Sequence, residues 1–556
     1  MQSIMNCIFV LKLITMKKTT QLKPLLQIYF AILGLVLLLN PIHLHSQNFV
    51  WATSQEIDYD FNPEMLNYVT TVNPAGDVYY AGLKTYANNY NLEAFGDNFF
   101  AKYDRYGEQK FFKIFSGDCI VKNITSDLDN YIYVVGSLRS DVTFSPGQTM
   151  EFYESGSANT FIIKYSQWGD FIWMKNLTEI YGFSNRINGL STDVNNNVYV
   201  AYADNANAST IIRKFSADGD ELLEIVQTSV PLVSSIDVSL NGDIFVAGSC
   251  PTSNATFGGV PYNSGFSYAS YVAKYNALGQ SQWVKFVEDV TCIEPQVKWS
   301  PAGDIYLSGQ LTSAHNFGAI PANGPEWVYD FFLAQMNSEG EFTWVREVPQ
   351  VLTGDASVGK LTHLDLDFFG NPYITGFIRN DISWDDTWQT SVTSRGLIVL
   401  AYTSDGDYRW VKAASGALDA QAISVFSPDE IYITGTAFGV VQLDDINLTA
   451  NSFYFPYLAK IEAVTTGTIS RDAFNSSVGI YPNPMRSHAN IQVENSMALI
   501  NEVEVLDMSG NTIKQFNNVN NEKITLQRDG MSDGIYFIRI NLSDGSKVSK
   551  KLVVIE

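Results

Sequence analysis

The sequence predicts an all-β protein, in which a seven-bladed β-propeller closed by the N-terminal strand precedes a small C-terminal antiparallel β-sandwich of the immunoglobulin-like type. Three observations support this fold class. A tight turn followed by alternating aromatic and small apolar residues occurs seven times between residues 75 and 435. A second pattern, two strands joined by a glycine-containing turn, follows six of the seven copies. Residues 479–556 lack both patterns and show short alternating strands separated by turns.

The composition indicates an acidic globular protein with more than one domain. The chain has 556 residues, more than a single hydrophobic core usually organises. Acidic residues outnumber basic ones by 58 to 35, which gives a formal net charge of −23. Because contacts to phosphates need clustered Lys and Arg, we expect no nucleic acid partner.

Residues 1–46 have the three-part organisation of a secretory signal peptide: lysines, an apolar run at Leu25–Leu39, and a polar end. We place the cleavage near Ser46 and Gln47. Met16 directly precedes the basic residues and is an alternative start of the chain. An uncleaved membrane anchor is the other interpretation, but the apolar run is shorter than the ~20 residues that a span needs. We therefore expect no stable transmembrane segment after processing.

Each copy of the first pattern predicts a strand that is entered through a tight turn with Asn, Asp or Gly. The spacing between the aromatic anchors of consecutive copies is 46 to 67 residues. Together with the second pattern, each unit contains four antiparallel strands, which is the content of a propeller blade. The anchors are Tyr79, Tyr133, Tyr199, Phe245, Tyr306, Tyr373 and Tyr432.

The seventh copy lacks the second pattern, and the missing strand occurs at the other end of the chain. "FPYLAKI" (455–461) is an outgoing strand with no Trp-containing strand after it, whereas "NFVWATS" (48–54) is a Trp-containing strand with no partner before it. We expect the strand of Trp51 to complete the seventh sheet, so that no sheet edge stays open. An open solenoid is the alternative, but it would need capping units that the sequence does not show.

Within the expected propeller domain, residues 47–461, roughly residues 48–461 resemble the SBBP-type bacterial propeller repeats, whose units carry a turn with Gly and Asn before "YV.G" and then "F.aKy...G...W". The copies "NGDIFVAG" (241–248) and "YVAKYNALGQSQWVK" (271–285) illustrate the match. The resemblance implies a propeller fold. It implies no particular activity, because propellers carry many unrelated functions.

A polar linker, residues 462–478, separates this region from residues 479–556. The latter resemble closely the type A C-terminal sorting domain of the type IX secretion system of Bacteroidota, through "YPNP" (481–484), "VLDMSGN" (505–511) and "GIYFIRI" (534–540), with "KKLVVIE" at the C-terminus. Pro482 and Pro484 cannot donate to a β-ladder, so we also expect them to stiffen the entry to this domain and to block a sheet edge. The resemblance assigns the sorting signal to Tyr481, Pro482, Asn483, Pro484, Gly510, Gly534, Tyr536, Lys550 and Lys551.

This resemblance implies a route and a partner. The signal peptide would direct the chain across the inner membrane, and the type IX secretion machinery would then pass it through the outer membrane. In the family the sorting domain is usually cleaved, and the cargo is released or attached to surface lipopolysaccharide. We therefore expect a protein that is secreted or attached to the outer cell surface. A structural module without a sorting role is the alternative.

No catalytic residues are predicted. Three His follow the signal peptide, His315, His363 and His488, and they are dispersed, with no HExxH, Cys-x-x-Cys or GxSxG motif. The mature chain has three cysteines, an odd number that cannot form a disulfide framework. Either Cys250 and Cys292 pair, or all three, with Cys119, are buried thiols; we favour the thiols.

Acidic residues recur six positions before three of the anchors, at Asp127, Asp193 and Asp367. A repeated Asp can bind calcium, but an Asp side chain that caps its own turn explains the same position without an ion, and we favour the turn. Asp365 and Asp367 in "LDLDFFGN" are the best calcium candidates. No other cofactor is expected.

The connections between the hairpins are long and irregular, whereas the hairpin turns are short. Long loops on a rigid scaffold often carry function, so we expect the ligand on the side of the long connections. Three Trp and two Asp in these loops suggest an aromatic and acidic platform for a sugar or peptide; the alternative is that the rings cover sheet edges. These residues are Trp327, Trp384, Asp385, Asp386 and Trp388.

Taken together, these features favour a non-enzymatic binding protein with an extracellular glycan or protein as its ligand. The alternative is a propeller hydrolase or lyase that acts on polysaccharide through paired carboxylates. Buried acids with shifted pKa values near the propeller axis would favour the enzyme. A purely structural envelope component is a third possibility, and it predicts no concave site.

Overall fold

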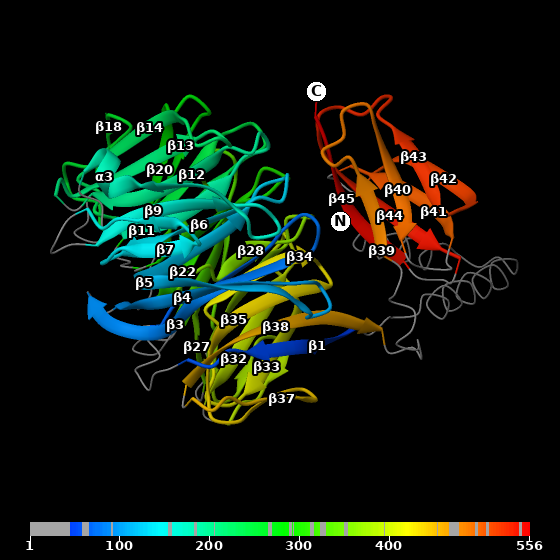
Figure 1. Ribbon diagram of the computed structural model, residues 1–556, viewed down its shortest axis with the longest axis horizontal. Coiled ribbons are helices and arrows are strands. Elements are labelled where there is room, and N and C mark those ends of the chain that lie inside the picture. The colour runs from blue at the N-terminus through cyan, green and yellow to red at the C-terminus, as the bar shows by residue number, and fades with distance from the viewer. Residues whose placement is uncertain are drawn as a thin grey trace, which may run out of the picture. The chain divides into compact units, whose positions relative to one another are not determined.

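The computed structural model describes residues 45–57, 66–90, 93–153, 158–182, 186–204, 206–264, 269–288, 292, 294–311, 316–322, 330–349, 354–393, 395–452, 454–465, 477–494, 499–507, 511–543 and 547–555. The predicted signal peptide, apart from residues 45 and 46, lies outside this set, as do Trp327 and Gly510. In the described residues the secondary structure is almost entirely β-strand (Figure 1), with one short helix, α3 (Leu177–Tyr181). Among the helices in the described ranges, none is long and apolar enough to cross a membrane.

All seven aromatic repeats form strands, and each lies second in a group of antiparallel strands that we call a unit; six units have four strands, and in the sixth the first strand is divided into two. The first unit is β2 (Tyr68–Val72), β3 (Val78–Tyr90), β4 (Glu93–Tyr103) and β5 (Gln109–Ser126), and the second is β5, β6 (Ile132–Leu138), β9 (Asn159–Tyr165) and β10 (Phe171–Asn176). The third is β11 (Arg186–Thr192), β12 (Val198–Asp204), β13 (Ser209–Phe215) and β14 (Glu221–Thr228), and the fourth is β15 (Leu232–Val238), β16 (Ile244–Ser249), β19 (Ala269–Tyr275) and β20 (Ser281–Glu288).

The remaining units follow the same order until the last. The fifth unit is β21 (Gln296–Trp299), β22 (Ile305–Leu311), β25 (Asp330–Met336) and β26 (Phe342–Glu347). The sixth is β27 (Asp355–Val358) with β28 (Leu364–Leu366), then β29 (Pro372–Arg379), β32 (Gly396–Tyr402) and β33 (Tyr408–Ser415). The seventh is β34 (Ala422–Ser427), β35 (Glu430–Phe438), β38 (Tyr454–Thr465) and β1 (His45–Ser54), so the first strand of the chain is the last strand of its last unit.

Short pieces occupy the connections. They are α3 (Leu177–Tyr181), β7 (Val142–Ser145), β8 (Gln148–Met150), β17 (Thr256–Phe257), β18 (Val260–Pro261), β23 (Asn316–Phe317), β24 (Ile320–Pro321), β30 (Ile382–Ser383), β31 (Gln389–Thr390), β36 (Val441–Leu443) and β37 (Ile446–Leu448). The helix α3 was not expected from the sequence. Asn176 caps it, accepting a hydrogen bond from the backbone N–H of Glu179.

The first two units share a strand, which the sequence did not indicate. The first part of β5 pairs with β4 and its second part pairs with β6, so both units belong to one sheet. Gly117 lies inside β5 at φ 134°, a conformation that favours glycine. Because no Asn-Gly or Pro turn interrupts this stretch, the chain passes from one unit to the next within a single strand.

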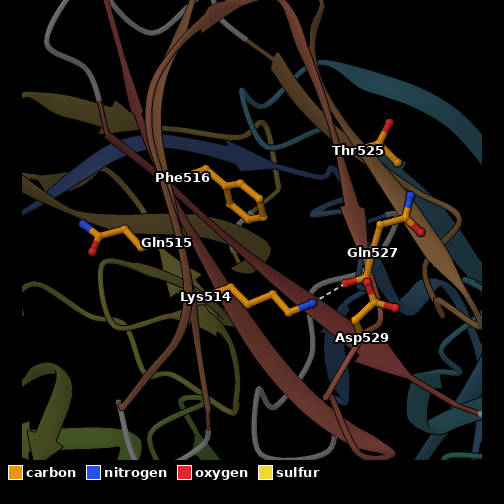
Figure 2. Close-up of a pocket in the computed structure, with 6 residues that line it drawn as sticks. All are labelled: Lys514, Gln515, Phe516, Thr525, Gln527 and Asp529. Carbon is orange, nitrogen blue, oxygen red and sulfur yellow. Dashed lines mark hydrogen bonds between the residues drawn. The ribbon is translucent and has the colours of Figure 1, made fainter.

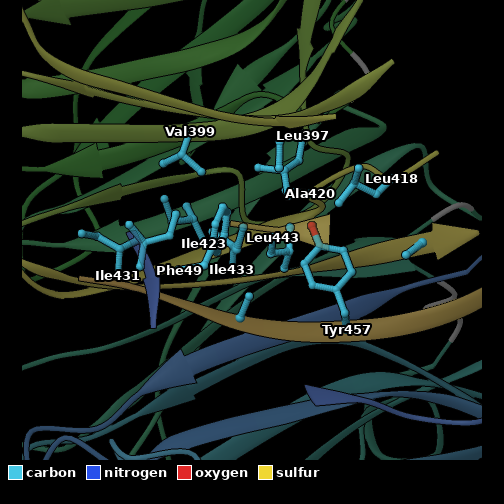
Figure 3. Close-up of a cluster of buried hydrophobic side chains, with 14 of the residues drawn as sticks. Phe49, Leu397, Val399, Leu418, Ala420, Ile423, Ile431, Ile433, Leu443 and Tyr457 are labelled. Atoms are coloured by element: carbon cyan, nitrogen blue, oxygen red, sulfur yellow. The ribbon is translucent and has the colours of Figure 1, made fainter. Parts of the chain in front are cut away.

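The side chain of Phe49 on β1 is buried in the core of the seventh unit (Figure 3). Its neighbours include Ile423 of β34, Ile431 and Ile433 of β35, and Val399 of the sixth unit. The backbone N–H of Phe49 also donates a hydrogen bond of 2.8 Å to Asp444. Both β1 and β38 are visible side by side in Figure 1. The N-terminal strand is therefore held by apolar burial as well as by its ladder.

The strands that begin each unit contact one another in succession. β2 contacts β5, β5 contacts β11, and the series continues through β15, β21, β28 and β34, which contacts β2 again. On two of these strands that lie at a sheet edge, a side chain of a neighbouring unit accepts from an outward N–H group: Ser424 accepts from Val72 N at 2.9 Å, and Asp237 accepts from Trp299 N at 2.7 Å. An edge whose donors are bonded in this way offers no free ladder to another chain.

Outer strands carry a second repeated contact. The indole N–H of Trp173 on β10 donates to the carbonyl of Ala217, in the β13–β14 turn of the following unit, at 3.0 Å. Trp283 and Trp344 make equivalent bonds to Ser338 at 3.2 Å and Ser404 at 3.1 Å. The glycine of each receiving turn lies against the indole ring, which explains why Gly and Trp recur together.

The C-terminal residues form the antiparallel sandwich that the sequence predicts. One sheet has the order β39 (Ser477–Tyr481), β40 (His488–Glu494), β43 (Lys523–Gln527), and the other has the order β42 (Thr512–Asn521), β41 (Ile500–Leu506), β44 (Gly534–Leu542), β45 (Lys547–Val554). Buried residues from both sheets, such as Ile491, Val503, Ile538 and Leu552, share one core.

Candidate functional site

Two of the predicted sorting motifs meet in the C-terminal sandwich, although 65 residues or more separate them. Asn483 donates from Nδ2 to the carbonyl of Lys551 at 2.9 Å, and its Oδ1 accepts from the N–H of Val553 at 2.8 Å. The N–H of Met485 donates to Val553 O at 2.7 Å, and Ile555 N donates to Met485 O at 3.0 Å. The "YPNP" segment is thereby fastened along the terminal strand β45.

The third motif, on β44, pairs with β45 along its whole length. Gly534 lies opposite Val554 and Tyr536 opposite Leu552. The hydroxyl of Tyr536 donates to Ser532 O at 2.9 Å, while the ring of Tyr481 is 43% exposed. β39 ends at Tyr481, directly before Pro482, as expected for a proline that cannot extend a ladder. The motifs thus form one continuous structure around the C-terminal strand.

A shallow cavity of about 390 Å³ lies beside β42 and β43 of the same sandwich (Figure 2). Lys514 donates from its amino group to Gln527 O at 2.6 Å across this cavity, and Phe516 and Asp529 also line it. The two strands that flank it are the edges of the two sheets, which explains why it is open. None of the residues predicted for sorting lines it.

A second cavity, of about 230 Å³, lies at the long-connection end of the units. It is formed where β22 and β29 end and where β32 and β34 begin, so the fifth, sixth and seventh units all contribute. Gln310 begins one of the long connections between hairpins, and Phe377, Arg379 and Arg395 belong to another, residues 377–396. The lining residues are Gln310, Val358, Gly359, Lys360, Phe377, Arg379, Arg395, Asp419, Ala420 and Gln421.

Cations dominate the charge of this second cavity. Arg379 and Arg395 both lie over the ring of Phe377, at 5.5 and 4.5 Å from its centroid. Asp419 is the one acid in the lining, 3.6 Å from Arg395. Burial lowers the pKa of Lys360 to about 8, partly offset by Asp419. Sequence reasoning emphasised the Trp and Asp residues of connection 377–396 and missed its two Arg residues, which lie at the end of β29 and directly before β32 of the sixth unit.

The predicted aromatic and acidic platform is only partly exposed. Trp384 is almost fully buried, donates from Nε1 to Thr390 Oγ1 at 2.9 Å, and packs beside Phe331. Its ring therefore belongs to the core. Asp385 and Asp386 are exposed and Trp388 is half-buried, so for these three a ligand contact stays a prediction.

The carboxylate of the calcium candidate Asp367 accepts hydrogen bonds from N–H and O–H donors of the protein. Asp367 accepts from Phe369 N at 2.9 Å, Asn371 N at 3.0 Å and the hydroxyl of Tyr373 at 3.0 Å, and it pairs with Arg409. This is the turn-capping arrangement, and Asp127 and Asp193 adopt it as well. Within the described ranges, no group of three or more His, Cys, Asp or Glu could hold a metal ion.

Acidic residues also occur on the strands that begin the units. Asp365 accepts from Val425 N at 2.8 Å and lies 3.3 Å from Lys298. Burial raises the pKa of Asp237, opposed by Lys298 and by hydrogen bonds from Trp299 N and Ser191. These groups join neighbouring units to one another. Cys119, Cys250 and Cys292 are thiols, and Cys119 and Cys292 are buried.

Comparison with known proteins identifies the C-terminal segment. Residues 479–555 match the family model described as the secretion system C-terminal sorting domain. No curated protein matches the chain. The protein is therefore an exported all-β protein with a C-terminal sorting domain. Its route is the type IX secretion system, which delivers it to the cell surface or the extracellular space.

Solved structures similar to the chain are distant. A protein of unknown function from Bacteroides caccae has 11% identity and a TM-score of 0.33, covering 57% of this chain and 89% of its own. The polysaccharide lyase Uly1 has 11% identity and a TM-score of 0.40, with 73% and 92% covered. A protein from Lactobacillus plantarum has 11% identity and a TM-score of 0.37, with 81% and 99% covered. These similarities are too low to carry a functional conclusion.

Proposed function

We propose that the seven units form a closed seven-bladed β-propeller, built of SBBP-like repeats, that presents a binding site to the outside of the cell. Three observations support the closure: β1 pairs with β38, the series of first strands returns from β34 to β2, and Trp51 bonds to Arg105 in the first unit at 3.0 Å. A closed propeller has no open sheet edge that could pair with another chain.

The function that we propose is non-enzymatic binding of an extracellular glycan or protein through the end of the propeller that carries the long connections. The observation that carries this proposal is the concave site at that end, on a chain that its sorting domain sends out of the cell. Concave sites with a few convergent polar groups are the usual places where ligands bind.

The sorting role of the tail can be tested by secretion. In a strain with a working type IX system, a chain lacking residues 479–556 should accumulate in the periplasm, and Asn483→Ala should reduce export. Asn517→Ala, at an exposed position of the same sandwich, is the matched control. Export of the truncated chain at the normal level would contradict the assignment.

Binding is tested on the full mature chain, with glycan arrays and polysaccharide substrates in parallel. Binding without product would support the proposal and give the ligand class. Release of product from any polysaccharide would contradict it and favour the hydrolase or lyase alternative.

A further inference from the structure

We infer that the cavity between the fifth, sixth and seventh units binds an anionic sugar residue, one that carries a carboxylate or a sulfate group. This inference deepens the proposed function and rests on it. It assigns a ligand class to the site through the arrangement of Lys360, Arg379 and Arg395.

The size of the cavity limits the ligand. At about 230 Å³ it is smaller than the roughly 300–1,000 Å³ of sites for drug-sized molecules. A single sugar ring of a longer chain fits such a volume better than a peptide segment with several side chains. Gln310 adds an exposed amide donor and acceptor to the lining, which are groups that bind sugar hydroxyls.

The two arginines form a prearranged pair. Phe377 supports both guanidinium groups on its ring, with Arg395 at 4.5 Å and Arg379 at 5.5 Å from the centroid. Stacking on an aromatic ring holds the planar guanidinium and limits its rotamers, so less entropy is lost when it binds a ligand. Guanidinium groups match carboxylate and sulfate geometry through paired N–H donors.

The lining contains one acid, Asp419, which forms an ion pair with Arg395. Asp419 accepts two hydrogen bonds on Oδ1, from the N–H of Thr436 at 3.0 Å and from its hydroxyl at 2.8 Å. Its other oxygen faces Arg395 at 3.6 Å, which is longer than a direct hydrogen bond. With three cations and one carboxylate, the lining carries a formal charge of +2.

Two acids just outside the lining form ion pairs with cations outside it, and a third, Asp355, lies opposite Arg379 in the β27–β29 ladder. Glu93 forms an ion pair with Lys122, and Glu294 forms one with Arg186 at 3.4 Å. Burial lowers the pKa of Lys360 to about 8 although Asp419, Glu294 and Glu93 favour its charged form. A bound anion would stabilise that charged form further. This positive site occurs in a chain whose net charge is −23, so it is not a consequence of the overall composition.

The experiment uses the full mature chain on an array with three sets of oligosaccharides: uronate-containing, sulfated and neutral. We expect binding to one or both acidic sets and not to their neutral counterparts. Arg379→Gln and Arg395→Gln should each weaken binding at least about tenfold, as for the loss of a charge-assisted hydrogen bond. Increasing the salt concentration from 50 mM to 500 mM should weaken it as well.

Controls separate the possible outcomes. Lys110→Ala removes a cation in the β4–β5 hairpin, outside the lining, and should leave binding within about twofold, as for an exposed cation. Thermal unfolding of each variant identifies loss of fold. Binding of a neutral glycan or a protein that is unaffected by both Arg variants would overturn the inference and leave the proposed function intact. Failure to bind any ligand would overturn both.

Discussion

The indole N–H of Trp51 donates a hydrogen bond of 3.0 Å to the backbone carbonyl of Arg105, 54 residues further along the chain. The same bond joins Trp173 to Ala217 and Trp283 to Ser338, in each case from one unit to the turn of the next. Trp51 belongs to the seventh unit and Arg105 to the first. The last unit therefore contacts the first unit in the way in which other neighbouring units contact each other.

Removal of this ring should destabilise the body of the protein. We expect Trp51→Ala to lower the free energy of unfolding by about 2–4 kcal/mol, less than the full cost of deleting a buried Trp because the ring is half-buried. Denaturant unfolding measures the change. Trp168→Ala is the control, since that ring is 67% exposed, and it should cost less than about 1 kcal/mol. Equal effects of the two substitutions would contradict a closing role.

Gly107 should be intolerant of a side chain for two separable reasons. Its φ is 87°, and a Cβ there would lie 2.8 Å from the ring of Trp51. Gly303 has a φ of 97° with open space around the Cβ position, so Gly303→Ala measures the backbone cost alone, about 1–2 kcal/mol. We expect Gly107→Ala to cost about 1 kcal/mol or more beyond that. A smaller cost for Gly107→Ala than for Gly303→Ala would show that the turn does not press on Trp51.

Asp330 should make stability depend on pH. Burial raises the pKa of this carboxyl from 3.8 to about 7, against hydrogen bonds from the N–H groups of Val348 and Phe331. Between about pH 4 and pH 7, the folded protein therefore keeps a proton on Asp330 that the unfolded chain has lost. The stability that this proton contributes is fully present below about pH 4 and is lost as the pH rises through 7. Asp330→Asn keeps an acceptor but cannot ionise.

The comparison with wild type isolates this group from others, such as His363, whose pKa burial lowers to about 4. Relative to wild type, Asp330→Asn should be more stable at pH 8 than at pH 5, by about 1–4 kcal/mol. Asp218→Asn, in the β13–β14 turn, should show no such trend. A difference that stays constant between pH 5 and pH 8 would mean that Asp330 ionises normally.

Calcium should contribute little to the stability of the body. Because the oxygens of Asp367 are bonded to N–H and O–H donors, we expect chelation by EGTA to leave the thermal midpoint unchanged. Asp367→Ala should instead destabilise by about 2–4 kcal/mol, since it leaves Arg409 and two turn N–H groups without their acceptor. A calcium-dependent increase of several degrees that Asp367→Ala abolishes would establish an ion site.

The sequence predicted the strands well because each turn carries its own local signal. An Asp or Gly in a tight turn and the aromatic residue after it act within a few residues, so the seven anchors could be placed without a structure. The Trp51 strand was also assigned correctly to the seventh sheet, because the seventh repeat lacked its fourth strand and the N-terminal segment contained a strand without a neighbouring partner. The shared strand β5 escaped prediction, since nothing local marks a strand that changes partners.

The candidate site was less predictable for the same physical reason. Arg379 and Arg395 flank one connection, but Lys360 precedes it and Asp419 follows a whole hairpin later. Their convergence depends on how the connections of the sixth unit fold and on how the seventh unit packs beside it, which no local pattern encodes. Trp384 shows the converse case: a Trp in a long loop suggested a binding platform, yet its ring is buried beside Phe331.

The pairing of β1 with β38 has a consequence for how the chain acquires its structure. The bond from Phe49 N to Asp444 spans 395 positions, so the first strand to leave the ribosome is among the last to find its partner. Contacts of such sequence separation slow folding, because most of the chain must be ordered before they form. Until residues 454–465 arrive, the N-terminal segment has no ladder to join. The seventh unit therefore cannot be completed until the last repeat has been synthesised, although its outermost strand is made near the start.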